Sequence, residues 1–293
     1  MVHEISSEQI TVQIQHSGIE LSSIQSKKTG MEYMWQSDPE VWGSSAPVLF
    51  PIIGALKNNS YLLDGETYSM PKHGIVRGNP NHEVIEALPH QITLNLEASD
   101  ETLQQFPFRF SFITRFSVKG HTLTVSHRVE NTGNQTLPFT LGAHPAFRCP
   151  LHNGDSYSDY ALLFEHAETL DRHLIDIPTG LISDSKERVL SNESRLPLTH
   201  DLFDRDALVF KNTKSKRVTL SHITRGKQLS IQFPSFPHLG IWAKPNGDFI
   251  CIEPWFGTAD PVDHNGEFIQ KDGMQFLAPG GNFEASYSIS VHE

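Results

Sequence analysis

Apolar and polar residues alternate with a period of two in short runs spread over most of the chain. Such alternation is typical of a half-buried β-strand, because successive side chains point to opposite faces. We therefore predict strands in runs of this kind at residues 10–14, 121–126, 217–221, 229–233 and 287–291. Clusters of Gly, Pro, Asn and Asp between such runs supply turns, for example at Asp64-Gly65 and Pro279-Gly280-Gly281-Asn282.

Helical periodicity is scarce, so we expect only a few short helices, near Asp100 to Gln105 and Leu196 to Leu202. The stretch from Leu151 to Arg188 has the least regular pattern, and we expect a long loop or an insertion there. No low-complexity linker divides the chain. The sequence therefore predicts an all-β fold, a large antiparallel sandwich of two twisted sheets that spans residues 1–293 as one domain.

Composition narrows the possible partners. The 293 residues carry a formal net charge of −11, which repels phosphate backbones and anionic lipid surfaces, so we expect no nucleic acid and no membrane partner. The first residues lack a cationic start and an apolar stretch, and no window approaches the ~18 apolar residues of a membrane span. We expect a cytoplasmic protein, a monomer or a homodimer. Two cysteines, Cys149 and Cys251, make no disulfide framework and are expected to be small buried residues.

The segment from Pro138 to Phe147 places small and polar residues on one face of a predicted strand. If side chains alternate there, Thr140, Gly142 and His144 share that face. Pro145 ends the strand because it cannot donate a ladder hydrogen bond, so the imidazole lies at a strand end that a ligand can reach. His144 is therefore a candidate site residue, and an ordinary core or surface histidine is the alternative.

A hairpin is predicted around Asn246-Gly247, since this dipeptide between apolar runs is a strong hairpin signal. With these two residues as the turn, Trp242 lies opposite Cys251, and Gly240 lies opposite Glu253. A carboxylate on an apolar strand costs several kcal/mol if it is buried without a partner. We expect Glu253 either to line a sugar-sized cleft, with the glycine and the indole as its floor and wall, or to pair with a buried arginine.

Other motifs for chemistry are few. His73 and Arg77 are both hydrogen-bond donors that could converge on hydroxyls or an anion, although ordinary surface roles fit them too. The stretch from Asp260 to Gly266 is similar to a calcium loop but lacks its full register. There is no H-x-H, no H-E-x-x-H, no cysteine pair at ligand spacing, no nucleophile elbow and no glycine-rich phosphate loop. We therefore expect no metal, no cofactor and no covalent catalysis.

Three segments together resemble the aldose 1-epimerase (galactose mutarotase) family, and most closely its bacterial mutarotase-related branch. They are residues 46–54 with 73–77, residues 140–147 and residues 252–255. Their order and spacing are far more specific than any one segment. The resemblance implies a large antiparallel β-sandwich, often called a supersandwich, and a reaction that interconverts the α and β anomers of a free sugar.

By this resemblance, Glu253 is the general base that takes the proton from the anomeric hydroxyl, and His144 is the general acid that protonates the ring oxygen. This chemistry needs an acid and a base, expected at opposite sides of the sugar, with proton affinities that are useful near neutral pH. From an unperturbed pKa of about 6.5, His144 needs only a modest upward shift to act as an acid.

The resemblance also implies residues that bind the sugar. His73 corresponds to a histidine that orients the substrate, Arg77 faces its hydroxyls or a substituent, and Asp206 is the best candidate for an acidic residue that binds hydroxyls. The hairpin register adds Trp242 as an apolar platform under the sugar ring.

One position departs from the family pattern. Related sequences often carry an arginine directly after the glycine of the Phe-Pro-x-x-Gly motif, whereas Ala55 follows Gly54 here and the nearest cation is Lys57. This puts in doubt any clamp that depends on that arginine, although Arg77 and Lys57 could still bind a phosphate. The alternatives are therefore a hexose-6-phosphate 1-epimerase and a non-catalytic sugar-binding or sensor protein. Glycoside hydrolysis would need a second well-placed carboxylate beside Glu253.

Overall fold

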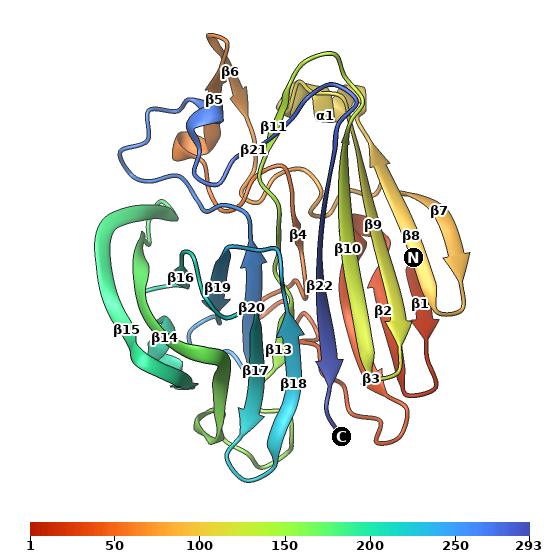
Figure 1. The fold of residues 1–293 in the computed structure, drawn as a ribbon, viewed down its shortest axis with the longest axis vertical. Coiled ribbons are helices and arrows are strands. Elements are labelled where there is room, and N and C mark those ends of the chain that lie inside the picture. Colours follow the sequence, from red (N-terminus) through yellow and green to blue (C-terminus); the bar gives the residue numbers. More distant parts are fainter.

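An antiparallel sheet of 15 strands dominates the computed structural model, which describes residues 1–293 (Figure 1). From edge to edge its main path runs through β4 (Val48–Leu49), β12 (Gly142–Ala143), β20 (Phe249–Trp255), β19 (His238–Trp242), β16 (Leu208–Phe210), β14 (Tyr160–Asp176), β17 (Arg217–His222), β18 (Gly226–Gln232), β22 (Asn282–Val291), β10 (Thr122–Asn131), β9 (Phe110–Lys119), β8 (Gln91–Glu97) and β7 (Glu83–Leu88). Off this path, β13 (Ala146–Arg148) pairs with β20, and β15 (Leu181–Pro197) pairs with β14.

Smaller sheets and short helices complete the fold. The sheets are β1 (Val2–Ser6), β2 (Ile10–Gln15) and β3 (Glu20–Ser26); β5 (Ser60–Leu63) and β6 (Glu66–Ser69); and β11 (Leu137–Phe139) and β21 (Gln275–Leu277). The α-helix is α1 (Asp100–Gln105), and 3₁₀ turns lie at Ser17–Ile19, Lys57–Asn59, Tyr157–Asp159, His200–Phe203 and Phe268–Gln270. None of these helices has the length and apolar character that crossing a membrane requires.

The core lies between the sheets. Figure 1 shows β7 to β10 with β22 on one side of the molecule and β14 to β20 on the other, and β1 contacts β8 and β9. Alternate residues of the strands are buried. Val12 of the β1–β3 sheet belongs to the same apolar cluster as Leu94 and Phe112 of the 15-stranded sheet. The expected all-β architecture and the five predicted strands are confirmed, since they correspond to β2, β10, β17, β18 and β22.

Two local predictions are wrong. The segment from Leu196 to Leu202 is not a helix, because β15 continues to Pro197 and only a 3₁₀ turn at His200–Phe203 follows. The region from Leu151 to Arg188 is mostly strand and not a long loop, since it contains all of β14 and the start of β15, and the alternative of an insertion stays a prediction. These two strands form a long hairpin whose register shifts at four places, so the period-two pattern breaks at each irregularity. By contrast, the short helix at Asp100–Gln105 is confirmed, with Ser99 as its N-cap.

The hairpin of β19 and β20 has the predicted register, with Gly240 opposite Glu253 and Trp242 opposite Cys251. Its turn lies one residue earlier than predicted. The amide of Gly247 donates to the carbonyl of Lys244 at 2.7 Å, which places Pro245 and Asn246 at the centre of the turn. Asn246 has φ 63°, and proline followed by a positive φ is the pattern of a type II turn.

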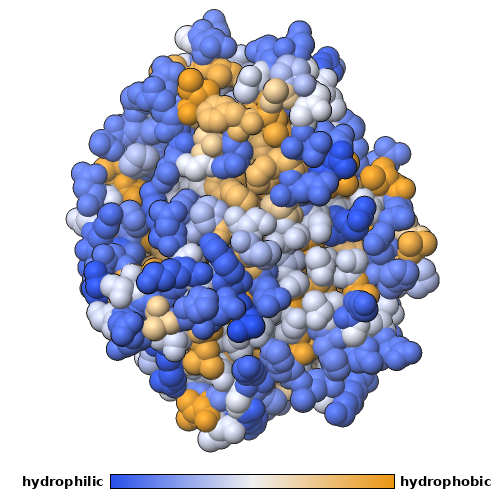
Figure 2. All heavy atoms as spheres, viewed as in Figure 1, coloured by the Kyte–Doolittle hydropathy of each residue, from blue (hydrophilic) through white to orange (hydrophobic).

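The face of the molecule in Figure 2 is largely polar. Figure 2 shows blue residues over most of one face and an orange patch near its top, the end at which Figure 1 places β11 and β21. Phe276 of β21 is 55% exposed there.

Candidate functional site

A pocket of about 160 Å³ opens beside β12, β19 and β20. Its polar lining residues are Lys72, His73, Arg77, His144, Asp206 and Glu253, and its aromatic ones are Trp42, Trp242 and Trp255. The remaining lining residues are small or apolar: Pro47, Ile53, Gly54, Ile175, Gly180, Ile182, Ala207, Val209 and Ala259. Six of the seven site residues expected from the sequence therefore line one cavity.

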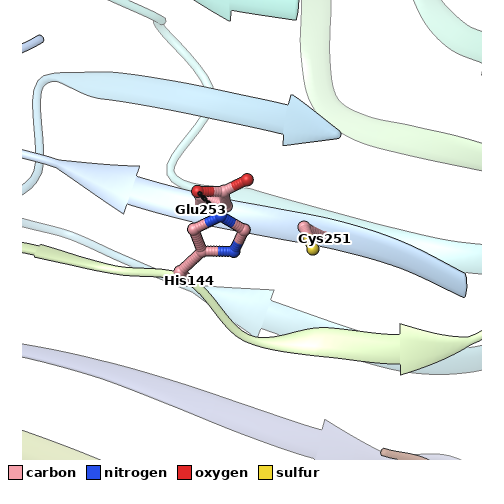
Figure 3. Close-up of side chains that lie close together, drawn as sticks. All are labelled: His144, Cys251 and Glu253. Carbon is pink, nitrogen blue, oxygen red and sulfur yellow. Dashed lines mark ion pairs between the residues drawn. The ribbon is translucent and has the colours of Figure 1, made fainter. Parts of the chain in front are cut away.

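His144 and Glu253 are in contact at this pocket. Nε2 of His144 lies 3.3 Å from Oε2 of Glu253, and the two side chains are almost fully buried (Figure 3). No basic side chain lies within ion-pair distance of Glu253 apart from this histidine. The alternative of a buried carboxylate paired with an arginine is therefore excluded, and the carboxylate faces an imidazole and the cavity.

Backbone pairing positions both groups. Glu253 lies in the middle of β20, where its neighbours β19 and β12 are fixed by the ladder. His144 lies between β12 and β13, in a segment held across β20: the amide of Phe256 donates to the carbonyl of Leu141, and the amide of Ile252 donates to that of Pro145. The imidazole is thereby brought to the carboxylate from a separate part of the chain.

Gly240 is not the floor of the cleft. A Cβ at this position would lie 2.4 Å from Cη2 of Trp255, so the indole of Trp255 occupies the space that the glycine leaves. The expected glycine floor is thus replaced by the Trp255 ring, which itself lines the pocket. The expectation failed because the register identifies which residues share a face, but it does not say which neighbouring side chain covers them.

Two indoles enclose His144. The ring of Trp42 stacks on the imidazole, with centroids 5.0 Å apart and planes at 27°, and Trp242 meets it edge-on at 5.8 Å. Trp242 is only half-buried and lines the cavity, as an apolar platform would.

Burial controls the proton affinities of the pair. It raises the pKa of the Glu253 carboxyl well above its usual range, while Lys72 acts in the opposite direction. It lowers the pKa of His144 to about 3, with smaller contributions of the same sign from Lys72 and Arg77. The shift of His144 is opposite to the modest upward shift expected from the sequence. Both shifts favour the uncharged forms, because a low-dielectric site disfavours charge.

His73 is positioned by a tight turn against the Phe-Pro-x-x-Gly motif. The amide of Gly54 donates to Nδ1 of His73 at 3.2 Å, so in the neutral imidazole Nε2 carries the proton. The turn needs Gly74, whose φ is 86° and whose Cβ would lie 2.2 Å from the carbonyl oxygen of Phe50. Burial, with His144 as the next cause, lowers the pKa of His73 well below its usual value, so the ring is a neutral donor.

Charged groups lie at the mouth of the pocket. Arg77 is exposed and donates from Nη2 to Oγ of Ser44 at 3.0 Å. Asp206 is half-buried, and its Oδ1 accepts from the amide of Ala207 at 2.6 Å. Lys72 is an exposed cation that also lines the cavity. The pocket thus presents two cations and one acidic residue around the His144 and Glu253 pair.

Lys57 does not belong to this pocket, so its assignment to the site is wrong. Its ammonium donates to the carbonyl of His264 at 3.0 Å, and its amide donates to Oδ2 of Asp260 at 3.0 Å. Ala55 is buried, and a Cβ on Gly180 would lie 3.6 Å from its methyl group. The place after the Phe-Pro-x-x-Gly motif is therefore covered by the tip of the β14–β15 hairpin.

Several pocket residues were missed. Lys72 precedes His73 in a turn whose positive φ angles no pattern predicts, and Trp42 lies in an irregular segment before β4. Ile175, Gly180 and Ile182 come from the β14–β15 hairpin, which the sequence did not predict. The available signals were weak: a charged neighbour of a candidate histidine, and a tryptophan in a region rich in turns.

Comparison with known proteins identifies the family. The sequence model of the aldose 1-epimerase family matches residues 1–288. The chain belongs to this family. Among curated relatives of this aldose 1-epimerase family member, protein LacX of Lactococcus lactis subsp. lactis is 33% identical over 300 residues, and the match covers 99% of each chain.

Solved structures agree with this assignment. A galactose mutarotase related enzyme from Lactobacillus acidophilus superposes with a TM-score of 0.94 at 33% identity, with 100% of this chain and 98% of that chain covered. A galactose mutarotase-like protein from Lactobacillus casei gives a TM-score of 0.92 at 29% identity, with full coverage of both chains. The family member described here therefore has the galactose mutarotase-like fold.

Proposed function

We propose that this family member is an active aldose 1-epimerase that interconverts the α and β anomers of a free aldose. The supporting observation is the 3.3 Å contact between Nε2 of His144 and Oε2 of Glu253 inside the pocket. The anomeric hydroxyl and the ring oxygen of a pyranose are bonded to the same carbon. An acid and a base that line one pocket can therefore serve both oxygens, and their placement at opposite sides of the sugar stays a prediction.

The reaction needs one proton transfer at each oxygen. The Glu253 carboxylate takes the proton of the anomeric hydroxyl, the bond from C1 to the ring oxygen breaks, and the His144 imidazolium protonates the ring oxygen. The open-chain aldehyde then rotates about the C1–C2 bond. Reclosure on the other face of the carbonyl reverses both transfers, so the pair returns to its starting protonation state.

The burial of the pair acts on both ends of this route. Before ring opening the reactive form is a carboxylate beside an imidazolium, and after ring opening both groups are neutral. The pKa of Glu253 is raised and the pKa of His144 is lowered by burial, so the pocket favours the neutral pair that ring opening produces and disfavours the charged pair that starts it. The charged pair and the neutral pair share the same single proton between the two side chains. Reaction of the closed sugar starts from the tautomer that has this proton on the imidazole.

The other pocket residues position the sugar. Nε2–H of His73 donates to a sugar oxygen, since its Nδ1 already accepts from Gly54. Arg77 and Asp206 bind hydroxyls as donor and acceptor, and Trp242 contacts the C–H face of the ring. Positioning of this kind holds C1 near both catalytic groups.

The test is the optical rotation of freshly dissolved α-D-glucose, α-D-galactose and other aldoses with and without protein. We expect faster approach to anomeric equilibrium with wild type and loss of that acceleration in Glu253→Gln. Tryptophan fluorescence of the same variant reports whether sugar still binds. Sugar binding with no acceleration for any aldose by folded wild type would favour the sensor role instead.

A second candidate substrate is a hexose 6-phosphate, and the observation that favours it is the presence of Lys72 and Arg77 at the same pocket. Two cations suit a phosphate better than a neutral hydroxyl. NMR exchange measurements on hexose 6-phosphates and on the free hexoses separate the two substrates. Lys72→Met should raise KM for the phosphorylated sugar only, whereas Lys57→Met, a lysine outside the pocket, is the matched control.

A further inference from the structure

A third reactive side chain lies beside the His144 and Glu253 pair. Cys251 precedes Glu253 by two residues on β20, and Figure 3 shows the imidazole of His144 beside the thiol and the carboxylate of this strand. One nitrogen of His144, Sγ of Cys251 and one carboxylate oxygen of Glu253 all lie within 4.8 Å of one another. The relative exposures of the three residues are 8%, 0% and 1%.

Several polar atoms of this cluster make no hydrogen bond within the protein. Oε2 of Glu253 makes no hydrogen bond and has only the 3.3 Å ion-pair contact with Nε2 of His144, Nδ1 of His144 is buried without a hydrogen-bond partner, and Cys251 is a free thiol. Unpartnered buried acceptors are rare in native proteins and call for an explanation. An imidazole nitrogen, a thiolate and a carboxylate form a ligand set that zinc accepts.

The spacing of one pair of ligand atoms fits a tetrahedral ion, and Sγ of Cys251 lies within 4.8 Å of both. Bonds of ~2.0–2.2 Å from zinc to nitrogen and oxygen place two tetrahedral ligand atoms about 3.4 Å apart, and Nε2 of His144 lies 3.3 Å from Oε2 of Glu253. His144 and Glu253 both line the pocket, so a fourth position faces the cavity and can take water. We propose that His144, Cys251 and Glu253 form an inhibitory binding site for a thiophilic divalent cation of the zinc type.

Charge balance suits a divalent cation here, and the thiolate selects a soft one. Binding of the divalent ion releases the thiol proton and the proton held by the His144 and Glu253 pair, which leaves one thiolate, one carboxylate and a neutral imidazole around a charge of +2. The buried complex is then neutral overall. Lys72 and Arg77 repel any cation, so binding requires a strong bond to the thiolate, which Mg²⁺ and Ca²⁺ do not form because they prefer oxygen ligands.

This site is not a cofactor site, since the ion occupies the two groups that would move protons in the sugar. No sequence motif marks this site, because His144 comes from one segment of the chain and Cys251 and Glu253 come from another. The inhibition rests on the proposed function, whereas binding of the ion does not. The two can therefore fail independently.

Cobalt(II) is the probe, because a thiolate ligand gives it a charge-transfer absorption band in the near ultraviolet. We expect this band in wild type, saturating at one ion per chain, and its displacement by Zn²⁺. It should persist in Cys149→Ser, the other buried free cysteine, and disappear in Cys251→Ser and Cys251→Ala. Zn²⁺ should then inhibit anomerisation in wild type and Cys149→Ser at a concentration about tenfold or more below that needed in Cys251→Ser.

Two results would overturn the proposal. One is the absence of a thiolate band in folded wild type at millimolar cobalt, and the other is a band that survives in the Cys251 variants but not in Cys149→Ser. Circular dichroism checks that each variant is folded, and the serine and alanine variants together guard against one of them misfolding. If wild type binds cobalt through Cys251 but accelerates no sugar, the ion site stands and the proposed epimerase function fails.

Discussion

The indole of Trp255 fills the space beside the missing side chain of Gly240. A Cβ on Gly240 of β19 would lie 2.4 Å from Cη2 of the indole. A Cβ on Gly142 of β12, the strand on the other side of β20, would lie 2.7 Å from Cδ1 of the indole. The ring is therefore held between two glycines of β19 and β12, and it forms a wall of the pocket next to Glu253. These glycines determine where the wall lies.

Gly240→Ala should displace this wall. The added methyl group meets a buried ring that Gly142 confines from the other side, so we expect a loss of about 1–3 kcal/mol in the free energy of unfolding and a lower kcat/KM for the sugar. Urea denaturation and tryptophan fluorescence measure the two effects. Gly43→Ala is the control, since its Cβ would come no closer than 3.8 Å to Pro39. Equal stabilities of the two variants would contradict the packing argument.

Glu253 and His144 should behave as one catalytic unit. Each of Glu253→Gln and His144→Gln removes one of two proton transfers that occur in the same step, so each should lower the rate of anomerisation by about 10²–10⁴-fold. The double variant should lose little beyond the worse single variant, because one missing member already disables the pair. Polarimetry after subtraction of the spontaneous rate gives these numbers. Losses that multiply in the double variant would show that the groups act independently.

A buried histidine outside the pocket should make the fold acid-sensitive. His127 lies between Phe112 and Tyr287, its Nδ1 is 2.9 Å from Oγ1 of Thr114, and burial lowers its pKa to about 3. Below about pH 6.5 the unfolded chain binds a proton at this side chain, whereas the folded chain does not until about pH 3. The free energy of unfolding therefore falls as the pH falls through this window.

The variant His127→Phe isolates this effect. Between pH 7 and pH 5, wild type should lose about 2 kcal/mol more than the variant, since a pKa difference of one unit corresponds to about 1.4 kcal/mol. Urea denaturation at the two pH values measures the difference. A substitution at the exposed His121 serves as the control. Equal losses in wild type and His127→Phe would refute the assignment.

The sequence predicted the half-buried strands and the β19–β20 register because both follow from alternation on a regular ladder. It did not predict the β14–β15 hairpin, whose register shifts at four places and whose outer residues are exposed along much of β15. Each irregularity moves the apolar positions to the other face, so no single period describes the strand. Because the hairpin was not predicted, its pocket residues Ile175, Gly180 and Ile182 were not predicted either.

The site was predictable where a backbone pattern places side chains and not where loops do. Glu253 and Trp242 share a face through the strand register, and both reach the cavity. Lys57 was expected there because it follows the Phe-Pro-x-x-Gly motif, but its chain turns toward Asp260 and His264 instead. Lys72 reaches the pocket because positive φ angles at the next two residues reverse the chain, which no spacing rule reports.

Asp260, the first residue of the stretch similar to a calcium loop, forms a buried ion pair with Lys271. Nζ of Lys271 lies 2.8 Å from Oδ1 of Asp260, with side-chain exposures of 0% and 1%, and Asp260 follows the pocket residue Ala259 in the chain. Lys271→Met leaves a buried carboxylate without its cation and should lower the free energy of unfolding by about 3–5 kcal/mol. Lys211→Met, which breaks a half-exposed pair with Asp272, is the matched control and should cost about 1 kcal/mol or less. Adding Asp260→Asn to Lys271→Met should recover much of the loss in urea denaturation, because the unpaired charge is gone. A small loss in Lys271→Met, or no recovery in the double variant, would mean that the pair adds little and that packing around Ala259 holds this wall of the pocket.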